Sequence, residues 1–382
     1  MNGRFITIST LGEEVKAYVP PPLPPNPKID LSPFYGKLDL ANQALGRLDG
    51  LHATLPDTGT LLYFYNRREA VLSSQIEGTQ SSLLELLLFE NELAPPSEDV
   101  TEVSNYVSAL QHGLKRLSEG FPLCNRLLRE MHEKLLRTGR GSDKQPGEFR
   151  RSQNWIGGTR PGNAVYVPPP VAEMEIVMSD LERFLHREDN RLPLLIDAAL
   201  VHAQFESAHP FLDGNGRLGR MLIALLFFEQ KVLREPSLYL SLYLKTHRDL
   251  YYQLLQGTRT HEDWEPWIAF FLEAVRFTAD EACATAQRIQ QLFSADRGRL
   301  RGVLRPGSML QLHEYLQKHP ITDLQYAARV TGLSITTAGS AMERMADIGL
   351  VREQTGKRRG RVYIYAEFLK ILEEGTDKPF PA

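Results

Sequence analysis

One stretch of twelve residues, His209-Pro-Phe-Leu-Asp-Gly-Asn-Gly-Arg-Leu-Gly-Arg220, holds a base, a carboxylate, a small flexible turn and two guanidinium groups. Residues 214–216 can adopt positive φ and turn successive backbone N–H groups toward one point, which forms a concave site for phosphate oxygens. The apolar run 221–228 predicts a helix that starts directly after this turn and aims its positive end at the same anion. Arg217 and Arg220 would share one face of its first turn. Because the Lys-Ser/Thr pair of a P-loop is absent, we expect a phosphate site of a different kind.

The stretch resembles the defining motif of the Fic family, His-Pro-Phe-x-Asp/Glu-Gly-Asn-Gly-Arg-x-x-Arg, and fills every specified position. Fic proteins usually transfer AMP from ATP to a hydroxyl side chain of a target protein. The resemblance implies that His209 is the general base for the incoming hydroxyl and that Asp213 is a Mg²⁺ ligand. ATP and Mg²⁺ are therefore the expected substrate and cofactor. The resemblance gives as nucleotide-binding residues Gly214, Asn215, Gly216, Arg217, Leu218, Gly219 and Arg220.

These roles agree with the chemistry of the side chains. An imidazole with a pKa of about 6.5 is largely neutral at physiological pH and can accept a hydroxyl proton. Attack at phosphorus needs mainly alignment and charge neutralisation, which arginines and a carboxylate-held Mg²⁺ supply. Outside this motif, a lone histidine at a helix start is more often structural, and Asp213 could equally cap a helix.

A second motif stands earlier in the chain, at Ser73-Ser-Gln-Ile-Glu77-Gly78. Ser73 and Glu77 are one helical turn apart and face the same way. The segment is similar to the inhibitory motif of Fic proteins, Ser/Thr-x-x-x-Glu-Gly/Asn. The resemblance implies that Glu77 pairs with Arg220 and so occupies the guanidinium that would otherwise receive the ATP γ-phosphate. Inhibition within one chain and inhibition across a homodimer both remain open.

Residues 147–170 alternate apolar side chains with glycines and prolines, which predicts a β-hairpin rather than a helix. Fic proteins carry a hairpin flap at this place, and strand addition along its edge would hold a target segment near His209. As an alternative, the hairpin only covers the core. The residues expected to dock the target are Trp155, Ile156, Gly157, Gly158, Val165 and Tyr166.

Two tyrosines after the motif, Tyr251 and Tyr252, lie on a predicted helix and are candidates to contact an adenine ring. Aromatic side chains at helical spacing more often belong to a core, and that alternative stays open.

The carboxy-terminal part changes pattern. Helices are expected near 310–316, 322–330 and 334–348, followed by two short strands around the basic tip Lys357-Arg-Arg-Gly-Arg361. This order resembles a winged helix-turn-helix. The basic tip favours phosphate contact, whereas the expected recognition helix carries Glu343 and Asp347 and few cations. DNA binding and a protein-interaction or dimerisation role are both open, and the second is favoured.

Charge and cysteine content bound the remaining possibilities. A net charge of -3 gives no global reason to expect binding to nucleic acid or membrane. No continuous apolar stretch suits a signal peptide or a membrane span. The two cysteines, Cys124 and Cys283, are far apart and lack metal-ligand spacing, which fits a reducing cytoplasm. We therefore expect a cytoplasmic protein.

Together these patterns predict an all-α Fic fold with a small β-hairpin flap and a C-terminal winged helix-turn-helix domain. The expected function is a self-inhibited protein adenylyltransferase that modifies Ser, Thr or Tyr. The alternatives are a Doc-like phosphotransferase, an enzyme that removes AMP, and an ATP-sensing DNA-binding regulator. The expected domains are an extended Pro-rich arm over 1–36, a helical region with the inhibitory helix over 37–120, a catalytic core over 121–295 and the winged helix over 300–375.

Overall fold

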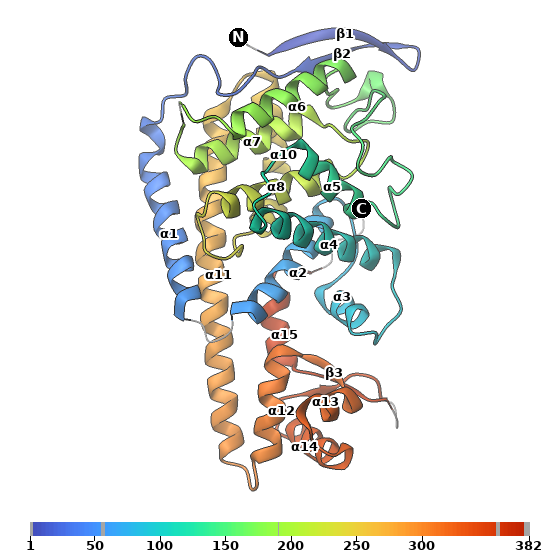
Figure 1. Cartoon of the computed structure of the whole chain (residues 1–382), viewed down its shortest axis with the longest axis vertical. Coiled ribbons are helices and arrows are strands. Elements are labelled where there is room, and N and C mark those ends of the chain that lie inside the picture. Colours follow the sequence, from blue (N-terminus) through green and yellow to red (C-terminus); the bar gives the residue numbers. More distant parts are fainter. Residues whose placement is uncertain (1–2, 55–57, 190, 357–359, 378–382) are drawn as a thin grey trace.

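A computed structural model describes residues 3–54, 58–189, 191–356 and 360–377. The chain is mostly helical, as predicted, and has two small sheets (Figure 1). In chain order the α-helices and strands are β1 Arg4–Thr10, β2 Glu13–Val19, α1 Tyr35–Thr54, α2 Thr58–Ile76, α3 Leu83–Glu90, α4 Glu98–Ser118, α5 Asn125–Leu135, α6 Val171–Leu185, α7 Leu194–Ala208, α8 Asn215–Glu229, α9 Ser241–Thr246, α10 Arg248–Thr260, α11 Trp264–Arg301, α12 Gly307–Lys318, β3 Ile321–Asp323, α13 Leu324–Thr331, α14 Ile335–Asp347, β4 Arg352–Glu353, β5 Val362–Ile364 and α15 Ala366–Glu373.

Helices α7 and α8 form the centre of the larger, upper part of the molecule. Every residue of α7 from Leu195 onward is buried, and α8 is buried over most of its length. A helix that is buried all round must be surrounded by other elements. Helices α2, α4, α5, α6, α10 and α11 pack against one or both of them. The loop between α7 and α8, which carries the motif, is thereby fixed on a rigid base.

Helix α11 is much longer than its sequence pattern suggests. The apolar pattern predicts a helix that ends near Arg288, but α11 continues to Arg301 without a break. It runs beside α1 in the upper part and extends down to the C-terminal region (Figure 1). The boundary expected between the catalytic core and the winged-helix domain, at residues 295–300, therefore falls inside a continuous helix rather than in a linker.

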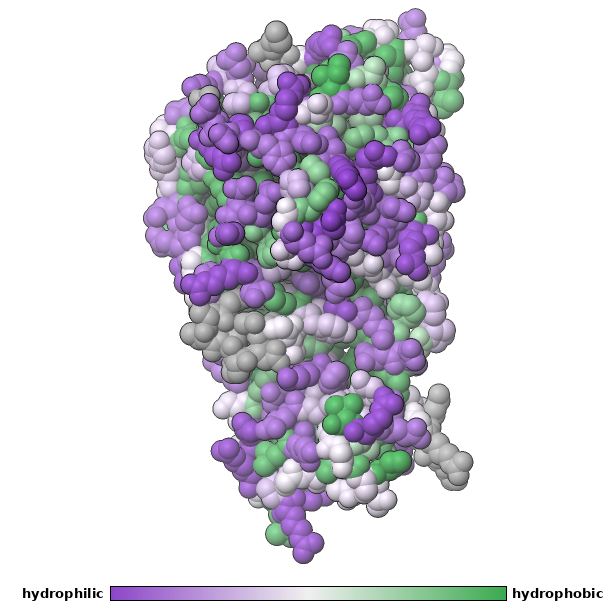
Figure 2. Space-filling view, in the orientation of Figure 1, coloured by the Kyte–Doolittle hydropathy of each residue, from purple (hydrophilic) through white to green (hydrophobic). Residues whose placement is uncertain are grey.

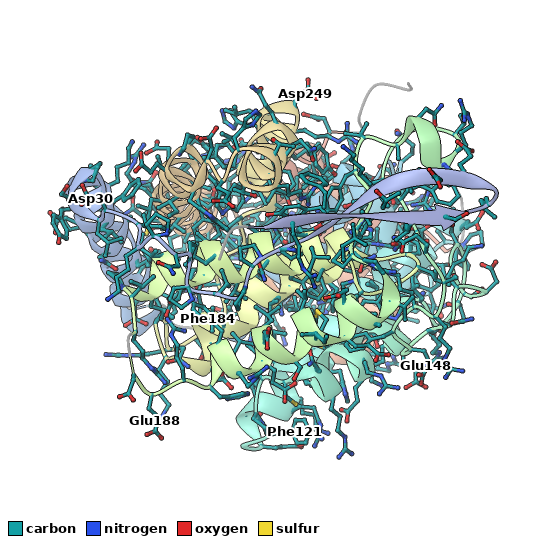
Figure 3. The ribbon with its side chains drawn as sticks, turned by 90° about the horizontal axis from the view of Figure 1, so that it is seen from above. Asp30, Phe121, Glu148, Phe184, Glu188 and Asp249 are labelled. Carbon is teal, nitrogen blue, oxygen red and sulfur yellow. The ribbon has the colours of Figure 1, made fainter. Side chains whose placement is uncertain are left out.

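The N-terminal residues differ from the prediction of an extended arm over 1–36. Strands β1 and β2 form an antiparallel hairpin, and irregular chain begins only at Pro20. The turn at Leu11 and Gly12 has positive φ at both residues, which suits a tight hairpin. The alternation of Val15, Ala17 and Val19 gives β2 one buried face. Figure 3 shows this hairpin lying across the helices at one end of the molecule.

The C-terminal region contains α12, α13, α14 and a three-stranded antiparallel sheet in the order β3-β5-β4. Strand β3 was not predicted. It is followed directly by α13, because the Asp323 side chain accepts hydrogen bonds from the first free N–H groups of that helix. Helix α15 then leaves the sheet and returns to pack against α2, α3 and α11 (Figure 1). The predicted helix break at Leu55 and Pro56, and the basic residues 357–359, lie outside the described residues.

The face drawn in Figure 2 is mainly hydrophilic, with hydrophobic residues scattered between polar ones. Among the described residues, no helix is both long enough and apolar enough to cross a membrane.

Candidate active site

The motif loop begins and ends in left-handed backbone. His209 ends α7 with a φ of 45°, and Gly214 precedes α8 with a φ of 78°. The prediction that Asn215 and Gly216 also have positive φ is wrong, because both lie in the first turn of α8. The Asn215 side chain instead closes the loop. It accepts from the N–H of Phe211 at 2.9 Å and donates to the carbonyl of Phe211 at 2.8 Å.

Residues outside the motif hold the loop in place, and the sequence analysis did not single them out. Arg150 donates from Nε to the His209 carbonyl at 3.0 Å and from its backbone N–H to the Pro210 carbonyl at 2.8 Å. Asn154 Nδ2 donates to the Phe211 carbonyl at 2.9 Å. The loop carbonyls are thus satisfied by Arg150 and Asn154, which both lie within the region 147–170 that was predicted to form the flap.

His132 supports the other end of the loop. Its Nδ1 accepts from the N–H of Gly147 at 2.9 Å, so the ring proton is on Nε2, which donates to the Asp213 carbonyl at 3.0 Å. Its ring stacks on Phe211, with centroids 3.8 Å apart. Burial lowers the pKa of His132 to about 4, which keeps the ring neutral.

The His209 imidazole is partly buried, and its Nδ1 has no hydrogen-bond partner among the described residues. Burial, together with the nearby cations Arg259 and Arg150, lowers the pKa of His209 to about 3. The ring is therefore neutral at physiological pH and able to accept a proton.

Asp213 is the most accessible charged group of the loop, with its side chain 35% exposed. Its Oδ1 accepts from the N–H of Gly214 at 2.5 Å and lies 3.4 Å from Arg217 Nη2, while Oδ2 faces Gly141. The described residues contain no cluster of three or more His, Cys, Asp or Glu side chains that could hold a metal. A lone accessible carboxylate nevertheless fits Mg²⁺, which takes one or two protein carboxylates plus phosphate and water oxygens.

Arg217 points into the protein rather than toward an open site. Its side chain is only 1% exposed, and its Nη1 donates to Oε2 of Glu102 at 3.1 Å. Glu102, which the sequence analysis missed, also pairs with Arg140 Nε at 3.2 Å. The expectation that Arg217 binds phosphates stays a prediction. Its contacts place it as an internal support for Asp213 and helix α4.

Arg220 faces the end of α2. It donates from Nε to the Ser73 hydroxyl at 2.8 Å and from Nη2 to the Ser73 carbonyl at 2.9 Å and to Glu77 Oε1 at 2.7 Å. The same Glu77 oxygen is 2.3 Å from the point where a Cβ on Gly216 would stand. The Glu77 carboxylate therefore sits over the first turn of α8, and Gly216 leaves room for it. The neighbouring Gly78 has a φ of 97°, which lets the chain turn away after α2.

Glu206 is a further buried acid beside this pair. It is 6% exposed, and its Oε1 has no partner among the described residues. That oxygen is 2.3 Å from the Cβ position of Gly219. Burial raises the pKa of Glu206 to about 7 despite the nearby cation of Arg220.

The two tyrosine candidates separate. Tyr251 is buried, and its hydroxyl donates to His202 Nε2 at 2.8 Å, while His202 Nδ1 donates to the Gly219 carbonyl at 3.0 Å. Tyr251 thus belongs to the core beneath α8, which is the alternative to an adenine contact. Tyr252 is partly exposed beside Arg248.

The expected flap is reduced to one antiparallel bridge, Ile156 to Tyr166, because glycines with positive φ at 157 and 158 and a short 3₁₀ turn at Pro161–Asn163 replace regular strands. Trp155 packs under β2 with Val15, Ala17 and Val167. Tyr166 is buried and its hydroxyl donates to the Ser207 carbonyl at 2.7 Å. Val165, by contrast, is 68% exposed.

Two cavities of about 420 and 490 Å³ lie away from the motif. The first lies between α2, α11, α12 and α15, and the second between the Pro-rich segment and the start of α11. Neither is lined by His209 or Arg220.

Comparison with known proteins agrees with this geometry. The family model of the Fic/DOC family N-terminal region matches residues 35–115, and that of the Fic/DOC family matches residues 122–227. Residues 35–115 and 122–227 therefore carry the N-terminal and central regions of the Fic/DOC family.

Two curated relatives carry the name Protein adenylyltransferase Fic. The one from Culex quinquefasciatus is 28% identical over 253 residues, and the one from Drosophila grimshawi is 26% identical over 248 residues. In both cases the match covers 64% of this chain and 47% of the relative, so the chain spans about half the length of these relatives.

Solved structures show the same fold. A Fic family protein from Desulfovibrio desulfuricans G20 has a TM-score of 0.55 at 19% identity and covers 86% of this chain and 95% of its own. Fic-1 from C. elegans has a TM-score of 0.53 at 19% identity and covers 66% of this chain and 74% of its own.

Proposed function

We propose that this protein is a self-inhibited adenylyltransferase that transfers AMP from ATP to a Ser, Thr or Tyr hydroxyl of a target protein, and to itself. The observation that carries the proposal is the complete motif between α7 and α8, with a neutral imidazole at its start and the N-terminus of α8 at its end. The curated relatives that carry the adenylyltransferase name support the same activity.

In the proposed reaction, the target hydroxyl oxygen attacks the α-phosphorus of ATP. The bond from that phosphorus to the bridging oxygen breaks, pyrophosphate leaves, and the hydroxyl proton passes to the ring of His209. The low pKa of His209 keeps this ring unprotonated before attack. The first N–H groups of α8 and the Arg220 guanidinium would bind the phosphates.

Asp213 would hold Mg²⁺ through its accessible carboxylate, and Arg217 keeps that carboxylate oriented from the buried side. When bound, the ion would neutralise phosphate charge.

Self-inhibition is supported by the contact of Glu77 with Arg220. As long as this contact persists, the guanidinium is occupied and the carboxylate sits over the turn that would receive phosphates. ATP can then bind only after Glu77 moves, or in a misaligned position.

The decisive experiment compares wild type, Glu77→Gly and Glu77→Gly/His209→Ala with ATP labelled at the α- or the γ-phosphate, with Mg²⁺ and a cell lysate. We expect α-label on protein with Glu77→Gly, little with wild type and none with the double variant. Protein-bound γ-label would show phosphotransfer instead. Loss of α-label from a pre-modified target on adding the wild type would show AMP removal.

The Doc-like alternative is disfavoured by Gly216. That branch of the family has lysine at this position, and here a side chain would meet Glu77 Oε1.

For the C-terminal region we propose a winged helix-turn-helix that binds a protein or a second copy of this chain rather than DNA. Arg361 on the proposed wing pairs with Glu343 of α14 at 2.9 Å, which offsets positive charge where phosphate contact would be needed. A salt-dependent mobility shift of random duplex DNA would contradict this assignment.

A further inference from the structure

The end of the inhibitory helix α2 is held from two sides. Ser73 and Glu77 face Arg220, whereas Gln75 lies between them in sequence and so projects from the opposite side of the helix. Gln75 is buried, and its Nε2 donates to the carbonyls of Ser81 and Thr376, at 2.9 Å each. The helix end thus lies between the active-site arginine and a segment near the C-terminal end of the described chain.

This segment, residues 373–377, consists of the last residue of α15 and the four residues after it, and a lysine holds it in place. Lys245 of α9 donates from Nζ to the Gly375 carbonyl at 3.0 Å and to the Asp377 carbonyl at 2.8 Å. The same Nζ donates to Gln75 Oε1 at 2.7 Å. One ammonium group therefore joins the segment and the inhibitory helix.

Further contacts attach the segment along α2 and α3. Arg68 of α2 donates from Nη2 to the Glu374 carbonyl at 2.8 Å. The backbone N–H of Leu84, at the start of α3, donates to Glu373 Oε1 at 3.1 Å. On the outer side, Arg288 of α11 pairs with both carboxylate oxygens of Glu374, at 2.5 and 2.6 Å.

The position of the segment depends on the C-terminal region. Only Tyr365 separates β5 from α15, so the small sheet, α15 and the segment form one continuous run. In Figure 1, α15 lies directly between the C-terminal region and α2. A displacement of the C-terminal region would therefore pull on the contacts of Gln75.

We propose that residues 373–377 are a clamp on the inhibitory helix, and that unseating them lets Glu77 leave Arg220. This inference rests on the proposed self-inhibition and adds the element that maintains it. It makes the C-terminal region a regulator of the active site through α15, without any contact of that region with ATP.

Gly375→Val tests the clamp locally. Gly375 has a φ of 79°, and a Cβ there would stand 2.4 Å from Leu242 Cδ1, so the substitution must displace the segment. Gly356→Val is the matched control, because Gly356 has a φ of 64° but nothing within 4 Å of its Cβ position. Lys245→Met provides a second variant that keeps the apolar stem and removes the ammonium group, with the exposed Lys370→Met as its control.

The first readout is transfer of α-label from ATP. Because the clamp acts through several hydrogen bonds, we expect Gly375→Val and Lys245→Met to raise transfer on the order of tenfold, and the two controls to leave it unchanged. In a Glu77→Gly background, Gly375→Val should add nothing, since the brake is already absent.

The second readout does not need activity. Hydrogen exchange of the backbone N–H groups of Glu77 and Gly78, which bond to the carbonyls of Ser74 and Gln75, should be faster in both clamp variants than in the controls. The clamp proposal would be overturned if the folded clamp variants showed unchanged hydrogen exchange and transferred α-label at the wild-type rate, while Glu77→Gly was active. An inactive Glu77→Gly would instead count against the proposed function, while exchange still tests the clamp.

Discussion

Glu77 Oε1 accepts a hydrogen bond from Arg220 Nη2 at 2.7 Å and lies 2.3 Å from where a side chain on Gly216 would begin. One carboxylate thus both binds the second arginine of the motif and fills the space above the first turn of α8. A competing anion must displace it from both places. The charge of Arg220 is buried, and although burial by itself lowers the pKa of its guanidinium, the negative charge of Glu77 helps to raise that pKa above its ordinary value.

The more a substitution weakens the contact between Glu77 and Arg220, the more it should relieve the inhibition of AMP transfer. A hydrogen bond between charged groups contributes roughly 1.5–3 kcal/mol, so Glu77→Gly should raise AMP transfer about tenfold to a hundredfold. Glu77→Gln keeps a hydrogen-bond acceptor but loses the charge, so it should raise AMP transfer less than Glu77→Gly does. Ser73→Ala removes one neutral acceptor of Arg220 and should raise transfer least of all. Initial rates of α-label transfer at an ATP concentration well below saturation would rank the three. Equal rates of transfer for folded Glu77→Gly and wild type would show that Glu77 does not inhibit the enzyme.

Glu102→Gln should destabilise the protein. Glu102 is buried and accepts from Arg217 Nη1, whose side chain is 1% exposed. Removing one partner of a buried pair costs about 3–5 kcal/mol, and because Asp213 stays 3.4 Å from Arg217 Nη2, we expect a loss near the lower end of this range. Urea unfolding followed by circular dichroism would measure this loss. The surface carboxylate variant Glu119→Gln, whose ion pair is exposed, should lie within about 0.5 kcal/mol of wild type.

Gly219→Ala should also be destabilising, although alanine normally favours a helix. A Cβ at this position would stand 2.3 Å from Glu206 Oε1 and 3.1 Å from Phe205 Cδ1. Overpacking of this kind costs about 1–3 kcal/mol. Shortening the acid in Gly219→Ala/Glu206→Ala should recover part of the loss relative to the sum of the two single variants. Strict additivity in unfolding free energy would show that the two sites do not touch.

Sequence reasoning located those features whose contacts are local along the chain. The motif loop and the helix α8 that follows it were expected, because turn residues and helical spacing encode them within a few positions. The pairing of Glu77 with Arg220, 143 positions apart, was expected only because the resemblance to Fic proteins implies it. Strong apolar periodicity predicts helices over residues 100–117, 125–136, 171–186 and 193–208, and α4 to α7 agree with these ranges within about two residues.

The features that were missed depend on residues far apart in sequence. The pairing of Arg217 with Glu102, more than a hundred positions earlier, was not expected. No sequence pattern around Arg150 or His132 indicates that these residues bind the carbonyls of the motif loop. The N-terminal hairpin was missed because the proline run after it dominated the interpretation, although Val15, Ala17 and Val19 alternate as a strand requires.

The buried His132 should make stability pH-dependent in a defined direction. Burial lowers its pKa from 6.5 to about 4 in the folded state, so the unfolded chain binds one more proton between these values. Wild type should therefore lose stability as the pH falls below 6.5, by up to about 1.4 kcal/mol per pH unit from this residue. His132→Gln, which cannot take up that proton, should be less stable than wild type at pH 8, and the gap should narrow toward pH 5. Urea unfolding of both proteins at pH 8, 6 and 5 measures the gap directly, and other titrating groups such as Glu206 cancel in the difference. A gap that stays constant across this range would mean that His132 is solvated in the folded protein, and the support assigned to it under the motif loop would have to be withdrawn.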